Sequence, residues 1–111
     1  MRAVSALEFA SALRKIGQLG GRQMDVLAAH YNAPGRAATT TDLARQVGYE
    51  GYKGVNLCYG NLAAKIETLV GVRAPDEKVL LLCEAEQDSE KHWVLTMRAE
   101  FAEGLRQAGW V

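Results

Sequence analysis

The sequence predicts a single, mainly helical α+β domain over residues 1–111, with a two-stranded β-hairpin and flanking N- and C-terminal helices. Two observations predict this class. Apolar residues recur at helical spacing through residues 5–70, and short apolar runs typical of strands appear only after residue 76. With 111 residues, 49% of them hydrophobic, the chain can form one core without cross-links.

The first two helices are expected at residues 5–16 and 21–32. Ser5 can cap the first helix, and a run of glycines separates the two. The second helix should end before Pro34, which leaves residues 36–39 as a short connection. The apolar residues expected to face the core are Leu7, Ala10, Leu13 and Ile16 in the first helix and Met24, Leu27, Ala28 and Tyr31 in the second.

The next two helices are joined by a tight turn. The third should begin after a cap at Thr39 or Thr40 and end at Gly48, where a left-handed residue is expected. The fourth is expected at residues 53–70 and is closed by Gly71. Its expected buried stripe consists of Val55, Cys58, Tyr59, Leu62, Ile66 and Leu69.

A hairpin and a last helix complete the predicted fold. Residues 79–83 and 92–97 suit two strands, residues 84–90 form an acidic connection between them, and residues 98–108 suit a helix. Trp110 and Val111 are expected to pack back onto the core. Three helices followed by a hairpin is the order of a winged helix-turn-helix, an arrangement that can place a helix in the DNA major groove.

Charge is balanced overall but unevenly distributed. The chain has 13 basic and 13 acidic residues, which argues against a strongly basic nucleic-acid coat protein. Residues 1–65 hold eight bases and four acids, whereas residues 66–111 hold five bases and nine acids. A basic first half suits contact with a polyanion on one side of the molecule.

No membrane segment, cofactor site or metal site is expected. No apolar run approaches the roughly 18 residues that a membrane span needs, and the first residues lack the apolar stretch of a signal peptide. Cys58 and Cys83 are therefore expected to be reduced thiols of a cytoplasmic protein. His30 and His92 stand apart without a ligand partner, and no catalytic motif is present, so no enzymatic activity is expected.

The candidate DNA contacts surround the turn and the start of the fourth helix. Lys53, Asn56 and Gly60 share one side of that helix. Asn56 can pair with adenine, and Lys53 can reach guanine or a phosphate. Gly60 in mid-helix costs about 1 kcal/mol relative to Ala, which favours close approach of a backbone or a ligand. The remaining candidates are Tyr49 and Tyr52, which can contact bases and phosphates, and the phosphate-binding candidates Arg36, Thr40, Thr41, Arg45 and Lys65.

Each of these residues has an alternative role within the fold. An ordinary helical hairpin has the same spacing, Asn56 can be simply solvated, and the tyrosines can pack the turn. The acidic residues 84–90 repel phosphates. The hairpin is therefore expected to point away from DNA, to meet a basic partner, or only to be solvated.

A stretch of residues 30–63 resembles a module that precedes the nuclease domain of bacterial HNH-type restriction-related endonucleases, which also has stand-alone versions. The resemblance implies a DNA-targeting role, including the reading of modified DNA, without cleavage, since the chain lacks an HNH cluster. The residues that carry it are His30-Tyr31, Ala33-Pro34, Thr39 to Ala44, Gly48-Tyr49, Tyr52, Val55 to Leu57 and Tyr59-Gly60, together with Trp93 to Met97 and Gly109 to Val111.

The sequence thus predicts a non-enzymatic double-stranded DNA-binding protein that senses base sequence or base modification. The alternative is a protein-interaction adaptor or dimerisation module on a winged-helix scaffold, with a homodimer, a nuclease or another protein as partner. An adaptor should bury an apolar patch, for which the candidates are Leu80, Leu82, Trp110 and Val111.

Overall fold

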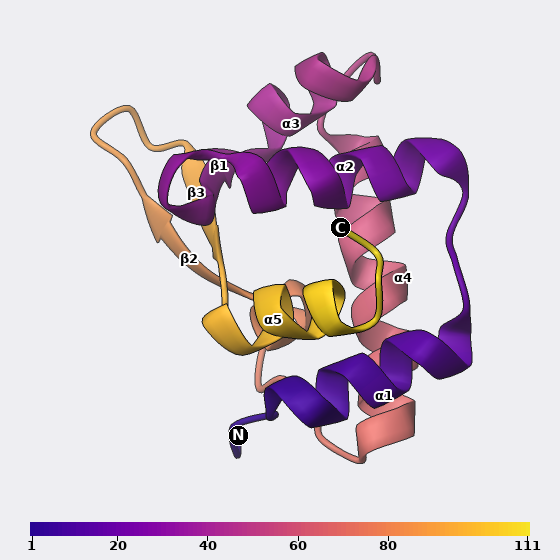
Figure 1. The fold of residues 1–111 in the computed structure, drawn as a ribbon. Coiled ribbons are helices and arrows are strands. Elements are labelled where there is room, and N and C mark those ends of the chain that lie inside the picture. Colours follow the sequence, from indigo (N-terminus) through magenta and orange to yellow (C-terminus); the bar gives the residue numbers. More distant parts are fainter.

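The computed structural model describes residues 1–111 as an α+β fold of five α-helices and a three-stranded antiparallel sheet (Figure 1). The predicted α+β class is therefore confirmed. None of the helices is long and apolar enough to cross a membrane. The elements are α1 (Ala6–Ile16), α2 (Gly21–Asn32), β1 (Ala37–Thr39), α3 (Thr40–Val47), α4 (Lys53–Val70), β2 (Cys83–Gln87), β3 (Trp93–Met97) and α5 (Ala99–Gln107), with 3-10 turns η1 (Pro34–Arg36) and η2 (Lys78–Leu81).

The helix ends follow the capping residues. Ser5 and Glu8 form a reciprocal capping box at the start of α1. The α3 cap is Thr39, whose Oγ1 accepts from the Asp42 backbone N–H at 3.1 Å. Gly48 closes α3 and Gly71 closes α4, both with left-handed backbones at φ 86° and 71°.

The sheet has three strands, so the predicted two-stranded hairpin is incomplete. Residues 37–39, expected within a connection, form β1 and pair with the free edge of β3, which gives the order β1-β3-β2. A strand of two alanines and one threonine is too short and too small to show a hydrophobic period. Its pairing depends on a strand more than 50 residues further along the chain.

The first hairpin strand was predicted wrongly at residues 79–83. Residues 78–81 form a 3-10 turn instead, and β2 occupies residues 83–87, of which residues 84–87 were predicted as part of the acidic connection. The apolar run turns inward: Leu81, Leu82 and Cys83 are all buried, whereas a strand with one solvated face would expose alternate residues. The Arg98 guanidinium holds the turn by donating twice to the Leu80 carbonyl, at 2.8 and 3.1 Å.

The core lies between the helices and the inner face of the sheet, and α1 lies beside α5 at one end of it (Figure 1). Several predicted core residues differ. In α1, Phe9 and Ala12 are buried although they were not predicted, and Leu7 is 71% exposed. Ile16 is half-buried and packs against the core as predicted. In α2 the fully buried residues are Val26, Leu27 and His30, while Met24, Ala28 and Tyr31 are half-buried, and Leu69 of α4 is exposed. Trp110 packs back as expected, with 7% exposure, but Val111 stays exposed.

Candidate functional site

One face of α4 is open to solvent along the whole helix. We call it the α4 outer face; its exposed residues are Lys53, Asn56, Leu57, Asn61, Lys65, Thr68 and Leu69, with Gly60 and Ala64 half-buried between them. The single acid of this helix, Glu67, turns inward. Its carboxylate accepts from the Ala74 backbone N–H at 2.8 Å and from Lys78 at 3.0 Å, and these bonds lower its pKa. The α4 outer face therefore carries two lysines and two asparagines without a carboxylate.

Gly60 lies at a position of α4 that no other element packs against. A β-carbon added there would have no heavy atom of another element within 4 Å. No neighbouring backbone in the protein therefore requires glycine at this position. Close approach of another molecule's backbone can explain Gly60 only if that molecule is a bound partner.

A buried histidine orients α4 relative to the sheet. His30 Nε2 lies 2.8 Å from the Leu95 carbonyl oxygen in β3, and Nδ1 lies 2.6 Å from Tyr59 Oη in α4. Because a carbonyl only accepts, Nε2 carries the proton and Nδ1 accepts from the tyrosine hydroxyl. Burial lowers the pKa of His30 and raises the pKa of Tyr59, so both are neutral. Sequence reasoning treated His30 as isolated and missed this link between α2, α4 and β3.

The two turn tyrosines have different positions. The Tyr49 ring lies on the α4 backbone at Gly54, where an added β-carbon would be 2.9 Å from Tyr49 Cδ1, and the Arg22 guanidinium lies 5.3 Å from the ring centre. Tyr49 therefore packs the turn. Tyr52, at the start of α4, is 50% exposed and its ring is free.

Three of the five predicted phosphate contacts lie on α3, with Thr40 and Thr41 at its start and Arg45 in its last turn. Thr41 is exposed and Thr40 half-buried, and neither hydroxyl is used in a hydrogen bond within the protein. Arg45 is exposed and forms a 3.3 Å ion pair with Asp42. Lys65 is exposed further along α4.

Arg36 does not join this group. Its guanidinium lies 4.4 Å from the centre of the Tyr31 ring, and its Nε is buried without a hydrogen-bond partner. Its charge also contributes to the lowered pKa of Glu103 in α5, after the larger contribution of Arg106. The side chain is thus engaged with α2 and α5.

The start of α3, the start of α4, η2 and the hairpin enclose a groove of about 660 Å³, which we call the α4–hairpin groove. It brings together Thr40, Thr41, Tyr52 and Asn56, all predicted contacts, with Trp93 of β3. Sequence reasoning placed Trp93 in a strand but gave it no function. Trp93 is 55% exposed and is the first residue of β3, next to the tip of the hairpin.

Strand β2 directs its two acids away from this groove. Glu84 pairs with Thr96 and Glu86 pairs with Val94, on the sheet face opposite Trp93, because side chains alternate along a strand. The inner face of the hairpin carries Ala85 and Gln87. The side chains of Glu84 and Glu86 therefore point away from α4.

The chain contains no group of three or more histidine, cysteine or acidic side chains that could hold a metal ion. Cys58 and Cys83 are buried and unpaired. Burial raises their thiol pKa values to about 11 and about 12, so neither is a thiolate at neutral pH.

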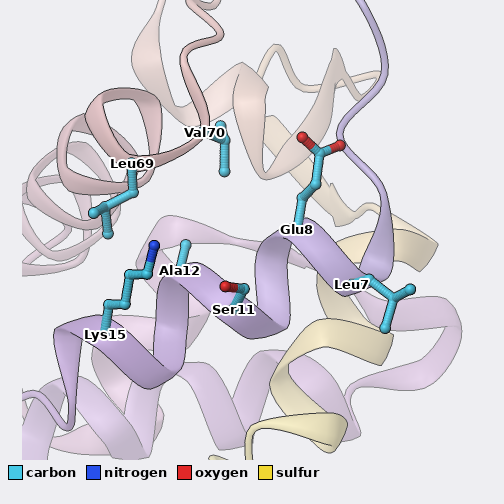
Figure 2. A pocket seen from close by; sticks show the side chains of 7 residues that line it. All are labelled: Leu7, Glu8, Ser11, Ala12, Lys15, Leu69 and Val70. Carbon is cyan, nitrogen blue, oxygen red and sulfur yellow. The ribbon is translucent and has the colours of Figure 1, made fainter.

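A second hollow, of about 300 Å³, lies between α1 and the end of α4. Figure 2 shows Leu69 and Val70 on one side of it and Glu8, Ala12 and Lys15 of α1 on the other. Two of the residues predicted for the apolar patch of an adaptor, Leu82 and Trp110, belong to the core and are not exposed. The predicted patch is therefore not formed. Leu7 and Leu69 are the exposed leucines on this side.

Comparison with protein-family models, with curated proteins and with solved structures gave no match for this chain. The resemblance to endonuclease-associated modules therefore stays a prediction.

Proposed function

We propose that this chain is a non-catalytic, double-stranded DNA-binding domain of the winged helix-turn-helix type, with α3 over the backbone and the start of α4 in the major groove. Three helices, α2, α3 and α4, precede the β2–β3 hairpin, and β1 extends the sheet. This order supports the winged-helix assignment. The resemblance noted above supports a restriction-related role. The two buried, unpaired cysteines suit a cytoplasmic location.

The observation that carries the proposal is the composition of the α4 outer face. A helix that lies in the major groove faces phosphates on both sides, so an exposed carboxylate there would be repelled. The only acid of α4 is buried against Lys78 and Ala74, while Lys53 and Lys65 remain free. Asn56 is exposed between them, and its amide can pair with adenine.

The surroundings of α4 agree with this placement. The exposed Arg45 and the hydroxyls of Thr40 and Thr41 lie at α3, where the first backbone N–H groups of a helix attract phosphate. The acids of β2 are directed to the other face of the hairpin. Arg36 and Tyr49 are left out of the proposed contact set, since both side chains are engaged within the protein.

The test is fluorescence-anisotropy binding to short duplexes, plain and methylated at cytosine or adenine, over a salt series. We expect affinity to fall steeply with salt, and Lys53→Ala and Lys65→Ala each to reduce the salt slope by about 1 without unfolding the protein. Lys15→Ala, an exposed lysine on α1, is the matched control and should bind as the wild type does. A difference between plain and methylated duplexes would establish modification sensing.

Equal affinity in wild type and in both lysine variants would overturn the assignment of α4 to the major groove. Binding to no duplex at low salt would overturn the DNA-binding proposal as a whole.

The second candidate is a protein-interaction or dimerisation module, and the hollow between α1 and α4 favours it. Leu7 and Leu69 are exposed beside this hollow, where a second copy or another protein, such as a nuclease, can cover them. Such binding should depend little on salt and should weaken in Leu7→Ala and Leu69→Ala. If the partner is a second copy that also binds DNA, the site should be palindromic.

A further inference from the structure

We propose that the α4–hairpin groove holds an unpaired DNA base, stacked on Trp93. This inference rests on the proposed DNA-binding function and specifies the form of DNA that the site takes. It adds Trp93, on the hairpin side of the groove, to residues of α3 and α4 that are also proposed to contact a duplex.

The shape of the groove selects against a stacked base pair. Its volume of about 660 Å³ lies within the range of small-molecule sites, roughly 300–1,000 Å³. A base inside a duplex presents only its edge to a protein, and proteins read that edge with a protruding element. To enter a concave site, a base must leave the stack.

The aromatic side chains that line the groove are Tyr52, His92 and Trp93, and two of them, Tyr52 and Trp93, offer large rings for stacking. Tyr52 comes from the start of α4 and Trp93 from the hairpin, and each is at least half exposed. The ring–ring contacts of the protein are Phe9 with Phe101 and His30 with Tyr59, so neither groove ring is stacked. An exposed, unstacked indole is the side chain on which a base stacks, whatever its identity.

Polar groups for the rest of a nucleotide are also present. The Asn56 amide has no hydrogen bond within the protein and can donate to and accept from the edge of a base. Thr40 and Thr41, at the start of α3, can take the neighbouring phosphate. Among the charged groups of the lining, Lys91 offsets the single carboxylate, Glu77.

The two acids of β2 leave the groove open to a strand, whereas Asp88 and Glu90 at the hairpin tip lie beside His92, each 3.6 Å from Nδ1. Glu84 and Glu86 lie on the opposite face of the sheet from Trp93. The strand would pass instead along the α4 outer face, which has lysines and no carboxylate. The groove is thus continuous with the surface proposed to bind the phosphate backbone.

The experiment compares three labelled probes of one sequence by anisotropy: a fully paired duplex, the same duplex with one bulged base, and the single strand. We expect the bulged duplex to bind about tenfold more tightly than the paired duplex. Trp93→Ala should remove this preference, and Trp93→Phe should retain most of it. Gln18→Ala, at an exposed position between α1 and α2, should change nothing.

Tryptophan fluorescence gives a second, direct measurement. The chain has two tryptophans, of which Trp110 is buried and Trp93 is exposed. Stacking of a base should quench the emission of Trp93. We expect the bulged duplex to quench wild-type emission and to leave the emission of Trp93→Phe unchanged, so that the buried indole serves as an internal control.

The outcomes separate the two proposals. Salt-dependent binding of all probes with equal affinity, unaffected by Trp93→Ala, would overturn the base-binding groove and leave duplex binding intact. Tight binding of the single strand and the bulge with no binding of the paired duplex would support the groove and overturn duplex binding. Binding of none of the probes would overturn both.

Discussion

The contact between α1 and α5 and the outer face of α4 each contain a glycine in the middle of a helix, and only one of them is explained by the fold. A β-carbon at Gly104 of α5 would lie 2.5 Å from Phe9 Cβ and 3.2 Å from the Ala10 backbone nitrogen. One at Gly60 would meet nothing within 4 Å. Both glycines carry the same helix-propensity cost of about 1 kcal/mol.

The difference separates a glycine that the packing of two helices requires from a glycine that no contact in the protein requires. At Gly104 the missing side chain lets α1 and α5 approach closely, and Phe9 and Phe101 pack edge to face at 5.3 Å between ring centres. At Gly60 the cost is not offset by any contact in the protein. Gly60 lies on the same helix face as Lys53 and Asn56, which is the face proposed to bind DNA.

The largest effect is expected from Gly104→Ala. The added methyl group would overlap Phe9 Cβ, an atom that cannot move without α1, so overpacking should cost about 1–3 kcal/mol and outweigh the gain in helix propensity. Urea unfolding at neutral pH measures it. The matched control is Gly60→Ala, the same chemical change at an open helix position. Equal stability of Gly104→Ala and wild type would show that α1 and α5 are not packed as described.

The helices could largely be predicted from the sequence, because the residues at which a helix begins and ends are set by local capping residues. The limits of α2 and α4 match the predicted 21–32 and 53–70, and the left-handed Gly48 and Gly71 lie where expected. The strands could not be placed equally well. β1 is too short to show a period, and the run at residues 79–82 is apolar because it is buried in a turn.

Only the part of the candidate site that lies on a single helix could be predicted from the sequence. Helical spacing alone puts Lys53 and Asn56 on one side of α4, and both are exposed. The groove depends on hairpin register, which brings Trp93 opposite Tyr52 and turns Glu84 away. A one-residue shift of that register would exchange the two faces, and no single segment specifies it.

A smaller effect is expected on the inner side of α4, from the titration of His30. Burial depresses its pKa below the ordinary 6.5, so the unfolded chain binds the proton more readily than the folded one. The stabilisation is complete above pH 6.5 and decreases as the pH falls below it, by at most about 1.4 kcal/mol per pH unit. The melting temperature should therefore fall between pH 7 and pH 5.

Two comparisons isolate this histidine. His92→Gln removes an exposed histidine and should keep the decrease, whereas His30→Gln should be less stable at neutral pH and should show a flatter profile. The carboxylates of Glu8 and Glu103, with pKa values lowered to about 2 by Arg2 and Arg106, lose their contribution only as the pH falls below about 4.5. An unchanged melting temperature between pH 7 and pH 5 would contradict the buried neutral histidine.

The smallest change in stability, and the sharpest test of the comparison, is expected from Gly60→Ala. The methyl group enters open space and alanine favours a helix, so the free energy of unfolding should increase by about 1 kcal/mol. Affinity for duplex DNA should nevertheless fall, because the added group would hold the bases or backbone away from α4. Urea unfolding and anisotropy on the same preparation measure both quantities. A variant that is more stable and binds with wild-type affinity would place Gly60 outside the DNA contact and would leave its cost without a functional explanation. A variant that is more stable and binds less tightly would show that the partner requires this glycine, as the contact of α1 with α5 requires Gly104.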